Sequence, residues 1–316
     1  MVPIPASLLY TPEYEALRFL PEGPRMLQHD PGKLGWVAIQ HGFNVATGSL
    51  NILDLATGVN RSIEMPGRPG FFAETVQPGI VLVGLDRRLV VCELSTGAIE
   101  DIGASVTEDD SLTINEGMAV EGGVLFGTKH IPFTDPIASV YFFDAASRTL
   151  RTLLGGQTCS NGKVIHGDVL IDIDSAPKAI TKYQLEGRFE KATKLGLVKP
   201  AAELPGFPDG MRPVNNESVV VAFYNPEPVS DGLAQQLHLD TGEVLCEWVI
   251  PGSPRVTCPE FASINGQTKI IFTTADEGMP AEIRAIAPGA GCLYMADVPA
   301  DFKVPAPPPL LALSWR

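Results

Sequence analysis

Short runs of β-branched and aromatic residues, separated by polar turn residues, extend along the whole chain. The clearest runs begin at Gly35, Ser49, Gly79, Arg88, Val124, Ser139, Asp168, Ala179, Ser218, Ala234, Val244 and Lys269. Each run has the length and composition of a strand, and no convincing amphipathic helical pattern lies between them. The pattern therefore predicts an all-β fold.

Polar turns between the paired runs form a degenerate repeat. They lie at Ala56-Thr57-Gly58, Ser95-Thr96-Gly97, Ala146-Ser147-Arg148, Glu186-Gly187 and Thr241-Gly242. Their spacing is roughly 40 to 55 residues, close to the length of one four-stranded propeller blade, whereas a β-sandwich has no such long-range repeat. Six units fit the length of the chain, so the sequence predicts a six-bladed β-propeller.

The six blades are expected within one domain that spans residues 1–316. Their expected bounds are 34–64, 71–102, 114–154, 161–195, 209–250 and 256–304. The apolar segment Leu8-Leu9-Tyr10 is expected to close the ring by pairing with a strand from the other end of the chain. The Pro-rich segment at residues 305–313 is expected to pack on the outside of the ring.

Composition narrows the possible functions. Hydrophobic residues make up 45% of the chain and charged residues 19%, which supports a buried core and argues against disorder. The formal net charge of −14 disfavours nucleic acid and anionic lipid as partners. No apolar run approaches the roughly 20 residues that span a bilayer. We therefore expect a soluble, cytoplasmic protein, either monomeric or dimeric.

The five cysteines are far apart and never form a CxxC pair. Neither a disulfide framework nor a zinc ribbon is therefore indicated, and free thiols are expected. Cys159 has no partner His at a spacing that suggests a nucleophile, so no role is assigned to it. The chain has no GxSxG elbow and no glycine-rich nucleotide loop, so no serine hydrolase and no nucleotide cofactor is indicated.

Four motifs that open blades pair a carboxylate or an amide with glycine. They are Pro21-Glu22-Gly23-Pro24, Ile114-Asn115-Glu116-Gly117, Cys159-Ser160-Asn161-Gly162 and Phe207-Pro208-Asp209-Gly210. Each one alone is an ordinary turn sequence. In a propeller, however, the innermost strands direct their ends into the central channel, so these side chains are expected to converge on one site.

With these motifs in this order, the chain resembles the family of gluconolactonases, regucalcin (SMP-30) and luciferin-regenerating enzymes, which are six-bladed propellers. The resemblance spans nearly the whole chain. It rests on Glu22-Gly23-Pro24, Asn115-Glu116-Gly117 followed by Gly127-Thr128, Ser160-Asn161-Gly162, Asp174-Ser175 and Pro208-Asp209-Gly210-Met211.

The resemblance implies that Glu22, Asn161 and Asp209 hold one divalent metal ion at the centre of the propeller. Carboxylate and amide oxygens suit Ca²⁺, Mg²⁺ or Mn²⁺, although three protein ligands with open positions also accept Zn²⁺ or Fe²⁺; Ca²⁺ is the expected ion. Asp209 is also implied as the general base that activates water, while the ion polarises the lactone carbonyl.

Asn115 and Glu116 are implied as substrate-binding residues, and Asp174 either faces the channel or only organises a strand end. Sugar-acid lactonases of the family carry Arg two positions before the blade-three Asn, where this chain has Thr113. This replacement removes one contact to a sugar acid and leaves a less polar lactone open as the substrate.

The expected function is metal-dependent hydrolysis of a small lactone, with a sugar-acid lactone as the default substrate. A related alternative is a phosphotriesterase-like hydrolase. A second class is a non-catalytic propeller in which the same site binds calcium for structure or regulation. A third is a propeller scaffold for protein partners, which would be indifferent to the loss of Glu22 or Asn161.

Overall fold

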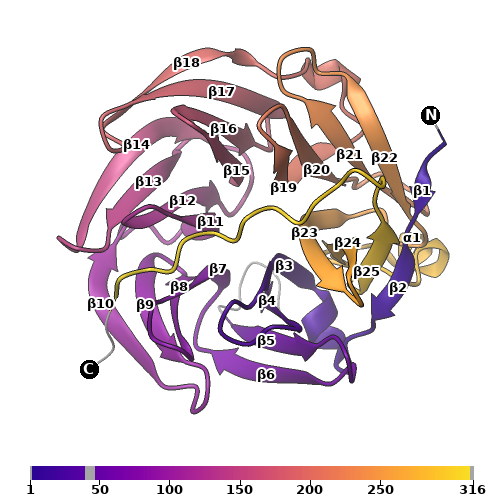
Figure 1. Cartoon of the computed structure of the whole chain (residues 1–316), viewed down its shortest axis with the longest axis horizontal. Coiled ribbons are helices and arrows are strands. Elements are labelled where there is room, and N and C mark those ends of the chain that lie inside the picture. The colour runs from indigo at the N-terminus through magenta and orange to yellow at the C-terminus, as the bar shows by residue number, and fades with distance from the viewer. Residues whose placement is uncertain (1, 40–46, 314–316) are drawn as a thin grey trace.

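A computed structural model of the chain, which describes residues 2–39 and 47–313, has six β-sheets arranged in a ring (Figure 1). The predicted all-β, six-bladed β-propeller is thus confirmed. In each sheet the strands are ordered from the centre of the ring outward. The expected strand that begins at Gly35 continues to His41, and its part beyond residue 39 lies outside the described residues.

The strands of the first three blades are β3 (Leu20–Met26), β4 (Lys33–Ile39), β5 (Gly48–Asp54) and β6 (Asn60–Met65); β7 (Pro69–Glu74), β8 (Ile80–Leu85), β9 (Arg88–Glu93) and β10 (Ile99–Ser105); and β11 (Leu112–Val120), β12 (Gly123–His130), β13 (Ala138–Asp144) and β14 (Thr149–Gln157).

The strands of the other three are β15 (Ser160–His166), β16 (Val169–Asp174), β17 (Ala179–Glu186) and β18 (Lys191–Leu197); β19 (Phe207–Asn215), β20 (Ser218–Tyr224), β21 (Gly232–His238) and β22 (Val244–Ile250), with β1 (Ile4–Pro5) parallel to β22; and β23 (Val256–Ile264), β24 (Gln267–Thr274), β25 (Leu293–Asp297) and β2 (Ser7–Tyr10).

The ring is closed by strands from both ends of the chain, as the sequence predicts. Strand β2 pairs antiparallel with β25, so the N-terminal segment supplies the outermost strand of the sixth blade. The first blade begins at Leu20 rather than at residue 34. Its inner strand was missed because L-P-E-G-P-R-M lacks the apolar alternation of a strand.

Two turns of the sequence repeat are stabilised by an aspartate side chain. Asp54 Oδ1 accepts hydrogen bonds of 3.0 Å from the backbone N–H groups of Ala56 and Thr57. Asp144 does the same for Ala146 and Ser147 in the third blade. Aspartate side chains that bind the backbone two and three residues ahead stabilise such turns. This is why the repeat is visible in the sequence.

A hydrophobic cluster fills each interface between neighbouring blades. Trp36 is fully buried between the sixth and first blades, and Trp248 between the fifth and sixth. Helical structure is confined to short segments: α1 (Ala281–Ile286), η1 (Glu15–Arg18) and η2 (Ala201–Glu203). None of the described helices is long and apolar enough to cross a membrane.

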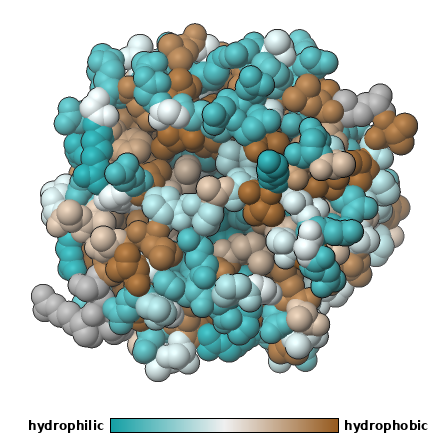
Figure 2. All heavy atoms as spheres, viewed as in Figure 1, coloured by the Kyte–Doolittle hydropathy of each residue, from teal (hydrophilic) through white to brown (hydrophobic). Residues whose placement is uncertain are grey.

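The Pro-rich segment crosses the central axis of the ring instead of packing on its outer strands (Figure 1). We call residues 304–313 the strap. Leu311 and Leu313 are buried between the second and third blades, and the backbone of Leu311 bonds to Glu74 and Val76. Figure 2 shows the same face as a surface of mixed polarity that is hollowed near its centre.

Candidate functional site

The central channel contains a cavity at each end. The two cavities are lined by different halves of the inner strands. The first cavity, which we call the carboxylate pocket, has a volume of about 340 Å³ and includes Glu22 and Asp209 in its wall. The second, which we call the strap pocket, has a volume of about 1040 Å³ and lies against residues 304–309 of the strap.

A β-bulge on every inner strand aims side chains into the channel. The pairing of β3, β7, β11, β15, β19 and β23 with the next strand shifts register at one place within each strand. On β3 the shift lies between Glu22 and Arg25, and on β19 between Pro208 and Met211. Bulges turn side chains away from the regular pleat, which explains why the blade-opening motifs meet at the channel.

The motif glycines allow neighbouring inner strands to approach closely. A Cβ atom on Gly210 would lie 2.1 Å from Cys258 Sγ on the next blade. A Cβ atom on Gly162 would lie 2.6 Å from the backbone nitrogen of Met211. Only glycine fits at such approaches. The glycines that follow Asn161 and Asp209 therefore hold these two residues in adjacent positions of the ring.

Four of the five predicted site residues line the carboxylate pocket: Glu22, Asn115, Asn161 and Asp209. The fifth, Glu116, is not among its lining residues. Glu116 Oε1 accepts a hydrogen bond of 3.2 Å from Arg212, whose side chain belongs to the strap pocket. The register of β11 shifts between Ile114 and Gly117, so Asn115 and Glu116 lie in the bulge, where their side chains leave the regular pleat and separate.

Among the described residues, one side chain donates a hydrogen bond to Glu22: the thiol of Cys258 lies 3.1 Å from Oε2. Removal from bulk water raises the pKa of Glu22 to about 8, although the bond from Cys258 lowers it. The negative charge of Glu116 raises the pKa further. Within the described chain, no cationic side chain lies within ion-pair distance of Glu22.

Asp209 is 5% exposed, and its Oδ1 atom is buried without a hydrogen-bond partner. Burial raises the pKa of Asp209 well above its usual value, and the charge of Glu22 raises it further. An unpaired buried carboxylate costs several kcal/mol in a folded protein unless a ligand compensates for it. The environment of Asp209 is therefore that of a group that requires a cation.

The amide of Asn161 is held in one orientation. Its Nδ2 donates to Ser175 Oγ at 2.9 Å, while its Oδ1 accepts from Asn115 Nδ2 at 3.1 Å. Asn115 Nδ2 also donates to the backbone oxygen of Ser160 at 3.0 Å. Asn161 Oδ1 thus has a fixed position and a second lone pair available to a ligand.

These residues fit a divalent metal ion. In the parts of the chain that the structure describes, no group of three or more His, Cys, Asp and Glu side chains is arranged to hold a metal. The predicted ligands are instead two carboxylates and one amide oxygen, with one buried carboxylate oxygen unpaired. Oxygen ligands of this kind match a hard cation such as Ca²⁺ or Mg²⁺.

Four further residues of the pocket wall lie outside the four blade-opening motifs: Lys129, Tyr224, Arg255 and Glu277. Lys129 directly follows the Gly127-Thr128 strand end, so inspection of that position could have identified it. Arg255 and Glu277 lie in connections between strands and belong to no motif. The guanidinium of Arg255 lies 5.3 Å from the ring centre of Tyr224 and donates to the backbone oxygen of Glu277.

Three further residues considered in the sequence analysis make contacts within the fold: Thr113, Asp174 and Cys159. Thr113 is 1% exposed and donates to the backbone oxygen of Asp86 at 3.1 Å. Asp174 accepts hydrogen bonds from the backbone N–H groups of Thr158 and Cys159, so it organises the turn before Asn161. Cys159 lines the pocket as a thiol whose pKa burial raises to about 12, which disfavours a nucleophilic thiolate.

Comparison with known sequences gives one family. Residues 20–276 match the profile of the family described as the SMP-30/Gluconolactonase/LRE-like region. No curated protein matches the chain by sequence.

Three solved structures share the architecture. A calcium-binding regucalcin from Agrobacterium tumefaciens str. C58 is 19% identical, with a TM-score of 0.81 over 98% of this chain and 99% of that chain. A luciferin-regenerating enzyme is 18% identical, with a TM-score of 0.76 over 92% and 95%. A gluconolactonase from Xanthomonas campestris is 13% identical, with a TM-score of 0.64 over 89% and 86%. At these identities the likeness shows the fold.

Proposed function

Because the chain belongs to the SMP-30/gluconolactonase/LRE-like family, we propose that it is a metal-dependent hydrolase that opens a small lactone in the carboxylate pocket. The observation that carries the proposal is the pair of water-shielded carboxylates, Glu22 and Asp209, beside the fixed amide oxygen of Asn161. No cation of the described chain neutralises these carboxylates within ion-pair distance. The kinship with gluconolactonases supports the reaction.

Glu22, Asn161 and Asp209 are the proposed metal ligands. A divalent ion bound by them would supply Lewis acidity toward the carbonyl oxygen of the lactone. Ca²⁺ is the proposed ion because the ligands are oxygen atoms and because the regucalcin with the same fold is a calcium-binding protein.

Asp209 is proposed as the general base. Its Oδ1 atom accepts no hydrogen bond from the described residues, so it is available to take a proton from an attacking water molecule. Asn115 lines the pocket beside Asn161 and is the proposed contact for the substrate. The small pocket volume of about 340 Å³ matches a small lactone rather than a polymer.

The test is hydrolysis of a panel of lactones, from gluconolactone to aliphatic lactones, by metal-stripped protein to which single divalent ions are returned. We expect one ion to restore turnover in the wild type and not in Asp209→Asn. Asp240→Asn is the matched control, because Asp240 lies in an exposed turn of the same blade and, among the described residues, pairs only with Lys182. Turnover by Asp209→Asn equal to that of the control would contradict the proposal.

A non-catalytic calcium-binding role is the second candidate. It is favoured by the side chain of Thr113, which bonds to Asp86 and offers the pocket no cationic contact for a sugar acid. Tight metal binding without turnover of any lactone, ester or phosphotriester would support this role over hydrolysis.

A further inference from the structure

Lys129 is a cationic side chain of the carboxylate pocket to which neither the metal site nor the proposed reaction assigns a role. It lies near the end of β12 and lines the pocket together with Glu22 and Asp209. Among the described residues, none makes a hydrogen bond to its ammonium group or an ion pair with it within 4 Å. Its three N–H donors are therefore available to a ligand.

Lys129 carries its positive charge at physiological pH. Burial lowers its pKa, but the negative charges around it, Glu277 first among them, outweigh burial and leave the pKa raised. Cys159, Glu22 and Asp209 contribute to the same direction. The pocket thus keeps a permanent ammonium group near its candidate metal ligands.

The other cationic groups along the channel already have partners. Lys163 Nζ donates to Ser160 Oγ at 2.7 Å and lies 3.4 Å from Asp172. Arg212 pairs with Glu116 and Glu260. Arg255, the second cation of the carboxylate pocket, stacks on Tyr224 and donates to a backbone oxygen. Lys129 differs from all of these because its charge has no fixed partner.

The charge of the pocket wall is positive when a divalent ion is bound. The wall contains three carboxylates, Glu22, Asp209 and Glu277, and two cations, Lys129 and Arg255. With all of these groups ionised around a bound divalent ion, the wall carries one net positive charge. A metal-loaded pocket of this kind attracts an anionic ligand.

The rest of the wall limits the size and shape of that ligand. Phe133 and Phe207 lie edge to face at the pocket, with ring centres 5.6 Å apart. Thr113 is the register partner of Lys129 on β11, and its neutral side chain bonds to Asp86. Lys129 is therefore the residue of this pair that gives the pocket a positive charge. A ligand that fits has a compact apolar ring and one negative group.

We propose that Lys129 binds a carboxylate of the substrate, so that the pocket selects lactones that carry a carboxylate in addition to the ring ester. This inference rests on the proposed function for the reaction, but the binding preference itself can be measured without turnover. The alternative is that Lys129 only balances the charge of Glu22, Asp209 and Glu277, in which case it would not discriminate between ligands.

The experiment uses two carbocyclic analogues that cannot be opened, 3-oxocyclopentane-1-carboxylate and its neutral carboxamide. Calorimetric titration of the Ca²⁺-loaded protein gives the dissociation constant of each. We expect the wild type to prefer the carboxylate by about tenfold or more, the range of a charged hydrogen bond. Lys129→Met should abolish the preference, and Lys129→Arg should retain part of it.

Lys178→Met is the matched control, because it removes the same charge near the pocket without changing the wall. Lys178 lies 4.9 Å from the ring centre of Phe207 but does not line the pocket. The control should keep the wild-type preference. The proposal is overturned if the wild type binds both analogues equally, if it binds neither at millimolar concentration, or if Lys129→Met keeps the preference.

Failure of this inference and failure of the proposed function are distinguishable. A Lys129-dependent preference without hydrolysis of any lactone would keep the inference and remove the hydrolase. Hydrolysis of neutral and carboxylated lactones at equal rates, with no preference in binding, would keep the hydrolase and remove the role of Lys129.

Discussion

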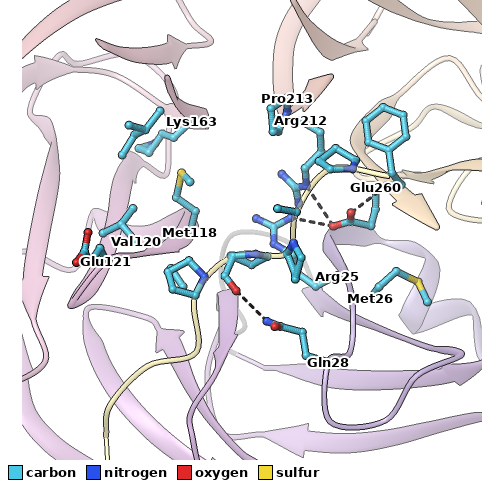
Figure 3. Close-up of a pocket in the computed structure, with 18 of the residues that line it drawn as sticks. Arg25, Met26, Gln28, Met118, Val120, Glu121, Lys163, Arg212, Pro213 and Glu260 are labelled. Carbon is cyan, nitrogen blue, oxygen red and sulfur yellow. Dashed lines mark hydrogen bonds and ion pairs between the residues drawn. The ribbon is translucent and has the colours of Figure 1, made fainter. Parts of the chain in front are cut away.

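The two ends of the propeller channel hold similar acidic side chains, but they differ in how the charges are balanced. At the strap pocket, Glu260 pairs with Arg212 at 3.2 Å and with Arg25 at 3.6 Å. Figure 3 shows both arginines pointing at this carboxylate beneath the strap. At the carboxylate pocket, Glu22 and Asp209 have no such partner among the described residues.

The paired charges at the strap pocket form a structural tie, a network that links several blades. Arg212 belongs to the fifth blade, and it bonds to Glu116 of the third, Glu260 of the sixth and the backbone of Pro24 in the first. Ion pairs that are shielded from water stabilise only when every charge has a partner. Both carboxylates of the network have an ion-pair partner, although Glu116 Oε2 is buried without a hydrogen bond. The network joins four blades across the channel.

The unbalanced end has the character of a binding site. Burial raises the pKa of carboxyl groups at both ends, but Glu22 and Asp209 have no cation within ion-pair distance among the described residues, and Lys129 lowers their pKa values only through space. Sites that bind charged ligands are expected to hold groups whose charges are unsatisfied until the ligand arrives. The difference between the two ends therefore separates side chains that hold the fold from side chains that await a cation.

The largest expected effect follows from Asp209→Asn. Loss of the proposed base and metal ligand should lower the rate of lactone hydrolysis by a factor on the order of 10² to 10⁴. Steady-state kinetics with the restored metal measures this rate. The free energy of unfolding of the metal-free protein should not fall, because the variant removes an unpaired carboxylate. Strong destabilisation of the metal-free variant would show that Asp209 holds the fold.

Arg212→Met should lower the stability of the fold, in contrast to Asp209→Asn. It leaves Glu116 without its cation and Glu260 with Arg25 alone, so the free energy of unfolding should fall by about 3 to 5 kcal/mol in denaturant titrations. Arg88→Met is the control, because its exposed pair with Asp101 should contribute less than about 1 kcal/mol. Equal losses in the two variants would refute the structural tie.

Leu311→Ala tests how the strap covers its end of the channel. Leu311 is 1% exposed, so its truncation should weaken docking of the strap by about 2 kcal/mol or more. The amide of Val76, which donates to the Leu311 oxygen at 2.8 Å, should then exchange its hydrogen faster. Hydrogen exchange followed by mass spectrometry measures this, and unchanged protection would mean that the strap docks without Leu311.

Cys258→Ala should have the smallest effect. It removes the one hydrogen bond to Glu22, which is worth about 1 kcal/mol, so the affinity for metal should change by less than about tenfold. Calorimetric titration checks this value. Complete loss of metal binding would mean that the thiol, rather than the carboxylates, defines the site.

Much of the fold was predictable because the turns and the closing strand follow local rules. Asp54 and Asp144 stabilise their own turns, and the apolar Leu8-Leu9-Tyr10 segment forms a strand that pairs with the ring and half-buries Leu9 and Tyr10. The path of the strap was not predictable, because proline fixes the backbone locally but does not determine which surface Leu311 will reach.

The candidate site was predicted in part. Asn115, Asn161 and Asp209 came from motifs whose glycines permit close packing at the channel. Glu116 points to the other end because it lies in the bulge of β11, which a motif read as one unit does not reveal. Lys129 directly follows the Gly127-Thr128 strand end, which marks the position, but its place in the pocket depends on how β12 lies against the neighbouring blade.

The measurement that tests this account most directly is calorimetric titration of Ca²⁺ into metal-stripped protein, with Glu22→Gln compared with Glu260→Gln. The two substitutions remove the same charge from opposite ends of the channel. The account predicts one site per chain in the wild type, no binding in Glu22→Gln, and near-native affinity in folded Glu260→Gln at reduced stability. Near-native binding in Glu22→Gln, or loss of binding in folded Glu260→Gln, would contradict it.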